Sequence, residues 1–480
     1  MTQRIFISAD HGLAIVYFLQ SDVLRTLLDD GVEVVLLTDD EIVERIRNRF
    51  AQPGLIIEGL RLKQVKQYFQ TRSYGVQWWL DFLRRAGASN RINLEAVDSY
   101  ISQVKDEAHS RRKLLFPFMQ LAVAILRRSR RARGWLQRAQ QRFTPDIYGD
   151  LFAKYQPSLV VASTPGWRYD RYLLREAAAH SIPTASVIVG WDNSSSYSLP
   201  GAPVDWITCW SEIQKQELVD GSDWDPARVH IGGIPSYDGY FKQEWVLPRA
   251  EYFQAHGLDP QRKLISFASS FITFSPNIQD IEALADLVSG GQLTEPSQLL
   301  VRLHPNHFMD VPRFAQEREA IFALAKKHPH VHVVEPVALG GSLGHYSGED
   351  MHEKSSMMAH SDVFVTVYST MVVEASAHKT PVVSACIDSP EGWPGNFTLP
   401  LSRIGDWPTH SRFRNSSAGR VAYDSDQLRD ALNFYLTHPG ADAEERAAFI
   451  ARECTFTDAS AGQRTGAYLL SCLGQTRGRE

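Results

Sequence analysis

The segment from Ser361 to Ser384, SDVFVTVYSTMVVEASAHKTPVVS, places the strongest constraint on the fold. It opens with β-branched and apolar residues up to Val367, a pattern that predicts a strand buried in a parallel sheet. Residues 371–378 have the composition of a short helix, and Thr380-Pro381 ends it before a second apolar strand from Val382 to Cys386. A strand–turn–helix–strand unit of this kind indicates an α/β domain.

The turn after the first of these strands is a candidate anion site. Ser369 or Thr370 is expected at the N-cap of the following helix. Free N–H groups in the first turn and the helix dipole would favour a phosphate there. Glu374 lies four residues into the helix, on a face that could reach a ribose. Taken alone, the segment fits equally well an ordinary capped helix with an incidental glutamate.

Two upstream strand ends add polar side chains. Residues 299–303 form an apolar strand that runs into Arg302-Leu303-His304-Pro305-Asn306, so Arg302 and His304 alternate onto one face. A strand at residues 264–268 runs into Ser269-Ser270. The C-terminal ends of parallel strands face the crevice in which α/β sheets bind ligands. The basic strand end with Arg302 and His304 and the hydroxyl-bearing turn together predict one pocket that binds an anion.

Composition limits the class of protein. The chain has 480 residues, 44% of them hydrophobic and 22% charged, which predicts a globular protein of two domains. A net charge of −5 gives no sign of a nucleic-acid partner. The four cysteines are scattered without metal-ligand spacing, so we expect neither a zinc site nor a disulfide framework.

These features together predict a cytoplasmic protein. Scattered cysteines suit a reducing compartment. The N-terminal sequence MTQRIFISAD enters a strand at once, so no signal peptide is expected. The longest near-apolar run, Leu114 to Leu126, is too short to span a bilayer.

The N-terminal residues predict a Rossmann-like opening. A strand at residues 4–9 precedes the loop Asp10-His11-Gly12, one helix continuing to Gly31, and a strand at residues 32–37. The G-x-G-x-x-G fingerprint is absent, so we do not expect this domain to bind a nucleotide in the NAD manner. Asp10 and His11 follow the first strand, where an acid or base would be well placed. A turn aspartate and a capping histidine are an equally good interpretation.

A third candidate acid–base residue follows a later strand. Residues 184–189 form a strand that ends in Gly190-Trp191-Asp192-Asn193, which brings Asp192 to a strand end.

We expect an N-terminal domain at residues 1–241, with a helical insertion at about 62–145. A C-terminal domain is expected at residues 263–440, and helices in residues 441–480 are expected to pack back across both domains.

The insertion contains an unusual basic segment. Between Arg111 and Arg142 there are ten Arg or Lys residues and no acidic residue, and the segment includes the apolar run LLFPFMQLAVAIL. A basic, apolar and aromatic segment is a candidate for binding an anionic membrane surface. The alternative is a helix packed in the core followed by a solvated charged helix.

Three segments resemble GT-B glycosyltransferases, in particular the CDP-glycerol glycerophosphotransferase-like branch, which includes cell-surface polysaccharide glycosyltransferases. RLHPN (Arg302 to Asn306) and SDVFVTVYSTMVVEA (Ser361 to Ala375) resemble the donor-site motifs of that branch. VGWDNSSSYS (Val189 to Ser198), with VHIGGIPSYD (Val229 to Asp238), resembles the end of its first domain. The likeness covers most of residues 157–400. It implies a GT-B fold with two Rossmann-like domains facing across a cleft.

By position, the resemblance implies that Arg302 and His304 contact the donor phosphates. It implies that Ser369 and Thr370 contact the same diphosphate, and that Glu374 contacts ribose or sugar hydroxyls. No metal or other cofactor is implied. The family's Asp-Tyr-Ser-Ser-like turn is Val367-Tyr368-Ser369-Thr370 in this chain. The missing aspartate favours a sugar transferase over a glycerophosphotransferase.

The expected function is transfer of a sugar from a nucleotide-activated donor to a hydroxyl of a saccharide or lipid-linked acceptor, in the synthesis of cell-surface glycan or glycolipid. The acceptor hydroxyl needs a general base, for which Asp10, His11 and Asp192 are the candidates. Ser269 and Ser270 join the donor-binding candidates. The alternatives are a UDP-sugar 2-epimerase-like isomerase or hydrolase, a CDP-polyol phosphotransferase, and a non-catalytic binding scaffold.

Overall fold

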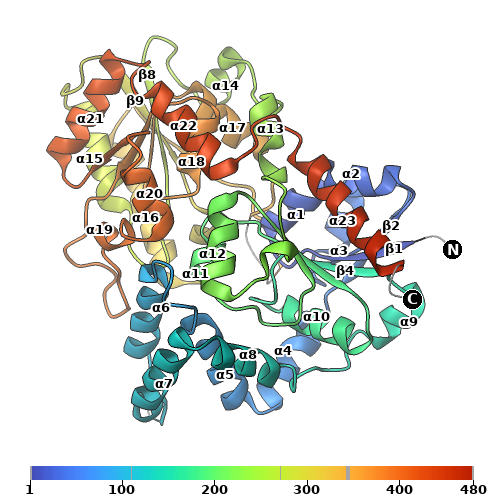
Figure 1. The fold of residues 1–480 in the computed structure, drawn as a ribbon. Coiled ribbons are helices and arrows are strands. Elements are labelled where there is room, and N and C mark those ends of the chain that lie inside the picture. Colours follow the sequence, from blue (N-terminus) through green and yellow to red (C-terminus); the bar gives the residue numbers. More distant parts are fainter. Residues whose placement is uncertain (1–2, 110, 271, 342–345, 478–480) are drawn as a thin grey trace. The chain divides into compact units, whose positions relative to one another are not determined.

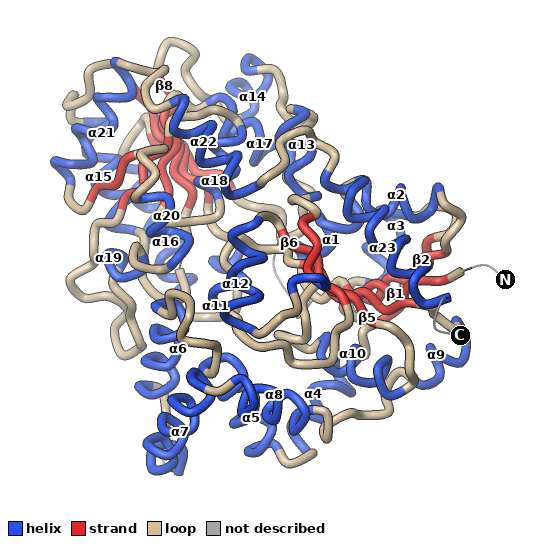
Figure 2. The backbone as a smooth tube through the Cα atoms, viewed as in Figure 1, coloured by secondary structure: helices blue, strands red, loops and turns tan. Residues whose placement is uncertain are grey.

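The chain forms two compact units, each built around a parallel sheet (Figures 1 and 2). The computed structural model describes residues 3–109, 111–270, 272–341 and 346–477. Unit 1 comprises residues 1–238, 339–344 and 454–480, and unit 2 comprises residues 239–338 and 345–453. The expected α/β class with two parallel sheets is confirmed.

The sheet of unit 1 has seven parallel strands in the order β3-β2-β1-β4-β5-β6-β7. The strands are β1 (Arg4–Ser8), β2 (Glu33–Thr38), β3 (Leu55–Gly59), β4 (Leu159–Ala162), β5 (Thr184–Val187), β6 (Trp206–Cys209) and β7 (Val229–Ile231). The strand order reverses between β1 and β4, so the loops after these two strands flank the topological switch point, where open α/β sheets bind ligands.

Both faces of this sheet are buried, as the continuous apolar runs of its strands predict. Ile5 and Ile7 belong to one apolar cluster, which includes side chains of α1 and α23, while Phe6 belongs to a cluster that includes α9 and α10. The covering helices are α1 (Gly12–Leu19), α2 (Asp22–Asp29), α3 (Val43–Phe50), α9 (Gly149–Tyr155), α10 (Asp170–Ala179), α11 (Asn193–Ser196), α12 (Glu212–Ser222) and α23 (Ala461–Arg477), with short 3-10 helices at Pro226–Arg228 and Pro235–Tyr237.

The single helix expected between residues 12 and 31 is wrong. The structure has two helices, α1 and α2, because the Ser21 side chain accepts a hydrogen bond from the Val23 N–H and caps a new helix. The C-terminal helix α23 packs closely on α2. A Cβ atom added at Gly466 would lie 2.6 Å from Cβ of Thr26, so the glycine permits this approach.

The insertion consists of α4 (Leu62–Thr71), α5 (Tyr74–Ala86), α6 (Glu95–Asp106), α7 (Arg111–Arg128) and α8 (Arg130–Gln140). Its own small core contains Phe82, Ala86, Phe116 and Val123. Between residues 62 and 140, the described residues thus form helices joined by loops.

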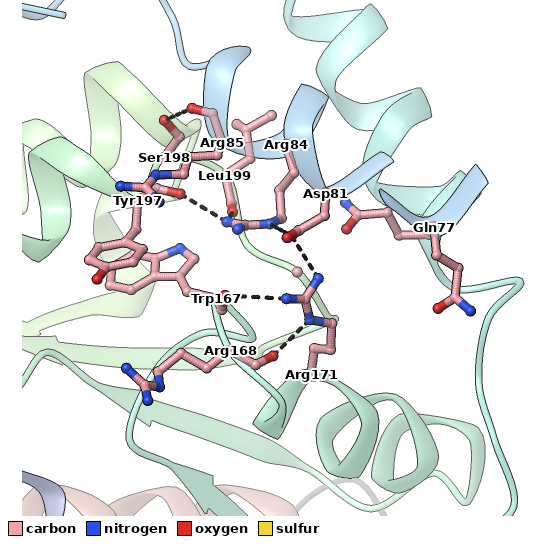
Figure 3. A network of polar contacts seen from close by, with 12 residues as sticks. Gln77, Asp81, Arg84, Arg85, Trp167, Arg168, Arg171, Tyr197, Ser198 and Leu199 are labelled. Atoms are coloured by element: carbon pink, nitrogen blue, oxygen red, sulfur yellow. Dashed lines mark hydrogen bonds and ion pairs between the residues drawn. The ribbon is translucent and has the colours of Figure 1, made fainter. Parts of the chain in front are cut away.

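A buried ionic network attaches α5 to the sheet domain (Figure 3). Asp81 accepts hydrogen bonds from Arg84 at 2.8 Å and from Arg171 of α10 at 2.6 Å. Arg84 also donates to the carbonyls of Tyr197 and Leu199 at 2.8 and 2.9 Å. Burial alone would raise the pKa of Asp81, but Arg171 and Arg84 together hold it well below its usual range.

The sheet of unit 2 has six parallel strands in the order β10-β9-β8-β11-β12-β13, with its switch point between β8 and β11. The strands are β8 (Lys263–Ala268), β9 (Ser297–Arg302), β10 (Val331–Val334), β11 (Val363–Thr366), β12 (Val382–Ala385) and β13 (Arg420–Ala422). The helices are α13 (Asp238–Lys242), α14 (Arg249–Ala255), α15 (Ile278–Ser289), α16 (Pro312–Lys327), α17 (Met351–His360), α18 (Met371–Ala377), α19 (Leu401–Ile404), α20 (Pro408–Arg414), α21 (Ser425–Thr437) and α22 (Ala443–Cys454), with the 3-10 helix η3 at Pro305–Phe308.

Candidate functional site

The switch point of unit 1 brings Asp10 together with residues that follow β4. Asp10 is fully buried, and its Oδ1 accepts a hydrogen bond from the Ser163 hydroxyl at 2.6 Å. The Arg168 guanidinium Nε lies 3.3 Å from Asp10 Oδ2. A carboxylate, a hydroxyl and a guanidinium therefore meet where two neighbouring strands end.

His11 caps the helix that starts beside this cluster. Its Nδ1 accepts a hydrogen bond from the Ala14 N–H at 3.0 Å, so the ring proton of the neutral form is on Nε2. Burial lowers the pKa of His11 to about 4, although the Asp10 charge opposes this. Near neutral pH the ring is thus uncharged and presents an N–H donor. In this arrangement it has no free lone pair with which to act as a base.

A second carboxylate lies near Asp10. Asp170, the first residue of α10, accepts hydrogen bonds from the Thr164 hydroxyl at 2.6 Å and from the Thr164 N–H at 3.1 Å. Burial raises the pKa of Asp170 well above its usual range, and the negative charge of Asp10 adds to the rise. The site thus combines an aspartate paired with arginine and an aspartate whose pKa is raised to about 7.

Sequence reasoning missed Ser163, Arg168 and Asp170. The loop that contains them follows a predicted buried strand. The criterion that singled out Asp10, a polar side chain just after a strand, could therefore also have found them. It did not, because the adjacency of β1 and β4 depends on a pairing across more than 150 residues.

Asp192 lies at the end of β5, separated from β1 by β4. It is half-buried, and its Oδ2 accepts a hydrogen bond from the Ser196 hydroxyl at 2.8 Å. Nearby, Trp167 from the β4 loop stacks on Tyr197, with ring centroids 5.4 Å apart (Figure 3). The three predicted acid–base residues therefore share one edge of the sheet, and aromatic rings border the same loops.

The switch point of unit 2 is flanked by the four predicted hydroxyl residues. Ser269 and Ser270 follow β8, and Ser369 and Thr370 follow β11. Within the part of the chain that the structure describes, the buried hydroxyl of Ser269 has no hydrogen-bond partner. Ser369 accepts a hydrogen bond from the Met371 N–H at 3.3 Å, and Thr370 is the N-cap residue of α18, without a side-chain cap bond.

His304 is held at the next strand end by a buried network. Its ring Nδ1 accepts a hydrogen bond from the Asn306 N–H at 3.1 Å, and the backbone N–H of His304 donates to Nδ1 of His307 at 3.1 Å. Nε2 of His307 is 3.0 Å from a Glu317 carboxylate oxygen, and the other oxygen accepts from the Ile278 N–H at 3.0 Å.

The same Glu317 oxygen accepts a hydrogen bond from the Asn277 N–H, and the Asn277 side chain accepts from the Ser270 N–H at 2.7 Å. The His307–Glu317 pair therefore connects the loop of His304 to the loop of Ser270. Sequence reasoning missed this pair. The only signal for it is the second histidine of the H-P-N-H motif, three residues after His304.

Arg302 is engaged by carboxylates of its own unit. Its Nε lies 3.1 Å from Glu353, and its Nη2 donates to Asp350 in a short contact. The Arg302 side chain is buried, and Tyr252 donates to the other oxygen of Glu353 at 3.1 Å. The role of Arg302 as a phosphate ligand stays a prediction, since its guanidinium already holds two acids.

Glu374 is also engaged internally. Its carboxylate forms an ion pair with Lys354 of α17 at 2.5 Å and accepts a hydrogen bond from the Tyr240 hydroxyl at 3.2 Å. Both Glu374 and Lys354 are buried. A contact of Glu374 with ribose or sugar hydroxyls therefore stays a prediction as well.

Residues 3–109, 111–270, 272–341 and 346–477 contain no cluster of three or more His, Cys, Asp or Glu arranged to bind a metal ion. In the same ranges, no helix is both long and apolar enough to cross a membrane.

Comparison with solved structures identifies the fold. A glycosyltransferase from Rickettsia africae matches with a TM-score of 0.52 and 10% identity, over 98% of each chain. A putative UDP-N-acetylglucosamine 2-epimerase from Listeria monocytogenes matches with a TM-score of 0.54 and 13% identity, over 99% of this chain and 98% of that one. The UDP-GlcNAc 2-epimerase from Neisseria meningitidis, bound to UDP-GlcNAc, matches with a TM-score of 0.51 and 11% identity, over 99% and 100%.

No protein-family model matches the chain, and no curated protein sequence matches it significantly. The architecture is of the GT-B type, shared by glycosyltransferases and UDP-GlcNAc 2-epimerases.

Proposed function

We propose that the protein is a metal-independent glycosyltransferase that moves a sugar from a nucleotide-activated donor to a hydroxyl acceptor in the cytoplasm, for the synthesis of cell-surface glycan or glycolipid. The observation that carries the proposal is the set of hydroxyl groups at the switch point of unit 2, beside His304. Parallel sheets bind ligands at this point. Among the described residues, the buried hydroxyl of Ser269 has no hydrogen-bond partner, and we assign it to the ligand.

The donor diphosphate is assigned to this hydroxyl-rich edge. The departing diphosphate gains negative charge, and preorganised donors aimed at it contribute roughly 3 kcal/mol each. Ser269, Ser270, Ser369 and Thr370 offer hydroxyl donors, and the His307–Glu317 pair fixes the orientation of the loop that carries His304. Arg302 and Glu374 support this edge through their ion pairs with α17.

The acceptor hydroxyl is assigned to the strand ends of unit 1. Asp10 or Asp192 would act as the general base, because Nδ1 of His11 already accepts a hydrogen bond from Ala14. His11 would instead donate its Nε2 proton to an oxygen of the acceptor. Arg168, whose Nε lies 3.3 Å from Asp10 Oδ2, would hold the carboxylate in position beside the acceptor.

A UDP-sugar 2-epimerase-like isomerase or hydrolase is the second candidate. Two observations favour it: the epimerases among the structural neighbours, and the two neighbouring carboxylates Asp10 and Asp170, with the pKa of Asp170 raised mainly by burial. Carboxylates around the sugar C2 suit that chemistry. A CDP-polyol phosphotransferase and a non-catalytic scaffold are both compatible with the GT-B fold, but no observation of the site favours either.

A nucleotide screen tests the assignment of the donor site. We expect one of UDP, GDP, CDP or CMP to raise the melting temperature, because a ligand that binds only the native state stabilises it. Ser269→Ala should weaken that nucleotide about ten- to a hundredfold, since a hydrogen bond to a charged group is worth about 1.5–3 kcal/mol. Ser384→Ala is the matched control, because Ser384 is also buried with an unpartnered hydroxyl, among the described residues, but lies inside β12.

Incubation of the labelled nucleotide-sugar with and without acceptor separates the functions. Label transferred only when acceptor is present supports the glycosyltransferase. An epimerised or hydrolysed sugar without acceptor supports the second candidate, and binding without turnover supports a scaffold. Equal nucleotide affinity in both serine variants would show that the donor site has been misplaced.

A further inference from the structure

One helix of the insertion exposes a continuous apolar stripe. On α7, Leu114, Phe118, Leu121 and Ile125 are 77%, 67%, 61% and 53% exposed. Their spacing of four, three and four residues puts them on one face of the helix. The opposite face of α7 is buried in the core of the insertion through Phe116 and Val123. Figure 1 shows α7 at the outer end of the insertion, away from the sheet of unit 1.

Arginines and lysines surround this stripe. Some of these arginines contact acids of the protein itself. Arg133 forms a bidentate pair with Asp223 at 2.6 and 2.8 Å, Arg127 bonds to Asp98 at 2.6 Å, and the exposed Arg130 lies 3.9 Å from Asp223. The basic side chains of α7, α8 and the residues just after α8 include six that are exposed: Lys113, Arg128, Arg130, Arg131, Arg138 and Arg142.

An aromatic side chain accompanies these cations. Trp135 of α8 is 62% exposed and lies four residues after Arg131 and three before Arg138, so the three side chains share a helix face. Tryptophan is enriched where a protein meets the headgroup region of a bilayer.

A cavity begins where α7 ends. It has a volume of about 470 Å³, and its lining includes Arg91, Arg127, Arg128 and Arg130. Trp224 also lines it, and its buried indole N–H has no hydrogen-bond partner among the described residues. Asp220, Asp223 and Asp225 line the cavity too, with Asp223 neutralised by Arg133. The lining as a whole is positive and offers N–H donors, which suits a phosphate group.

We propose that the exposed face of α7, with the exposed cations of α8, binds an anionic lipid bilayer. Such a bilayer offers an apolar phase in which the exposed stripe can be buried, and negative charge that attracts the arginines. A second copy of this chain is a poorer match, because a symmetric contact would bring the same arginines together. The cavity would receive a lipid phosphate headgroup.

The inference deepens the proposed function, because it makes the acceptor a lipid-linked saccharide, but membrane binding itself needs neither donor nor acceptor. The test is co-sedimentation of the full chain with phosphatidylcholine vesicles, with and without phosphatidylglycerol, across a salt series. We expect binding that requires phosphatidylglycerol and falls as salt rises. Hydrogen exchange in α7 should slow when such vesicles are added.

Three variants separate the contributions. Arg128→Gln/Arg130→Gln/Arg131→Gln/Arg138→Gln should weaken binding at least a hundredfold, because each basic residue near an anionic surface is worth about fivefold. Leu114→Gln/Phe118→Gln/Leu121→Gln/Ile125→Gln should abolish insertion without unfolding the protein, because the replaced side chains are exposed. Lys326→Gln/Lys327→Gln, also exposed but on α16, should bind as the wild type does.

Three outcomes would overturn the proposal: binding that ignores lipid charge at low salt, equal binding by all three variants, or no binding by the wild type. A wild type that dimerises while the glutamine variant of the stripe stays monomeric, with no binding to vesicles, would make α7 a contact between copies. None of these results depends on turnover. Failure of membrane binding is therefore distinguishable from failure of the proposed glycosyl transfer, which the nucleotide screen measures on its own.

Discussion

The buried ion triad of Arg302, Asp350 and Glu353 makes a quantitative prediction for unit 2. In Arg302→Met the guanidinium is replaced by an apolar chain. Arg302 Nε lies 3.1 Å from Glu353 Oε2, and two unit charges at that separation attract by about 5 kcal/mol at an effective dielectric of about 20. Desolvation offsets much of this attraction, but removing one partner leaves buried charge unpaired, at a typical cost of about 3–5 kcal/mol. We expect the free energy of unfolding of unit 2 to fall by that amount.

The loss should depend on pH in a defined direction. Burial already raises the pKa of Glu353, while Arg302 opposes the rise. Without Arg302, the native-state pKa of Glu353 would rise further above that of the unfolded chain, so the native state would bind more protons. Stability then falls as pH rises through this range, so the deficit of Arg302→Met should be larger at pH 8 than at pH 5.

Hydrogen exchange measured by mass spectrometry on peptides of β9 and α17 is the suitable assay, because it reports opening of this unit locally. The double variant Arg302→Met/Glu353→Gln removes one of the stranded charges and should recover part of the loss. Unchanged protection in Arg302→Met at every pH, combined with weaker nucleotide binding, would refute the reasoning. That result would show that the guanidinium serves the ligand instead of the two carboxylates.

Chelation and protonation provide two further checks. Glycosyl transfer should survive EDTA, because hydroxyl and imidazole groups are proposed to hold the diphosphate; loss of activity that Mg²⁺ or Mn²⁺ restores would contradict this. Burial, with a smaller effect of Arg412, lowers the pKa of His410 to about 3. The unfolded chain therefore binds this proton first, and unit 2 should lose stability as pH falls from about 6.5 towards 3. His410→Phe should reduce that slope by up to about 1.4 kcal/mol per pH unit in unfolding measurements, and an unchanged slope would contradict the assignment.

The parallel sheets were predictable because buried parallel strands are continuous apolar runs. Residues 363–366 and 4–8 show this pattern without ambiguity, and both are central strands. The helix after β1 was less predictable, since its apolar spacing continues smoothly past Ser21. The hydrogen bond from the Val23 N–H to the Ser21 hydroxyl caps a second helix, and the spacing of apolar residues carries no information about such a cap.

The sequence predicted which strand ends carry the candidate site residues, but not which other residues those side chains contact. Asp10 and Ser269 were found because they follow recognisable strands. Whether a side chain at a strand end is free depends on contacts that the local sequence does not contain. Arg302 was interpreted as a phosphate ligand because it is a cation at the end of a parallel strand within the RLHPN motif. The two carboxylates that it contacts lie 48 and 51 residues further along the chain, so the local sequence does not reveal them.

Charge in this protein is used in two different ways. In unit 2 the cations Arg302, at the end of β9, and Lys354, in α17, are buried and paired with carboxylates, so they add little net charge to the site. On the insertion, cations such as Arg131 and Arg138 are exposed, and the intervening sequence has no acid to neutralise them. Because salt screens exposed charges far more than buried pairs, a salt series separates the two roles. Vesicle binding should weaken as ionic strength rises, whereas the stability of the donor-site edge of unit 2 should change little. The membrane proposal and the donor-site proposal can therefore be tested independently.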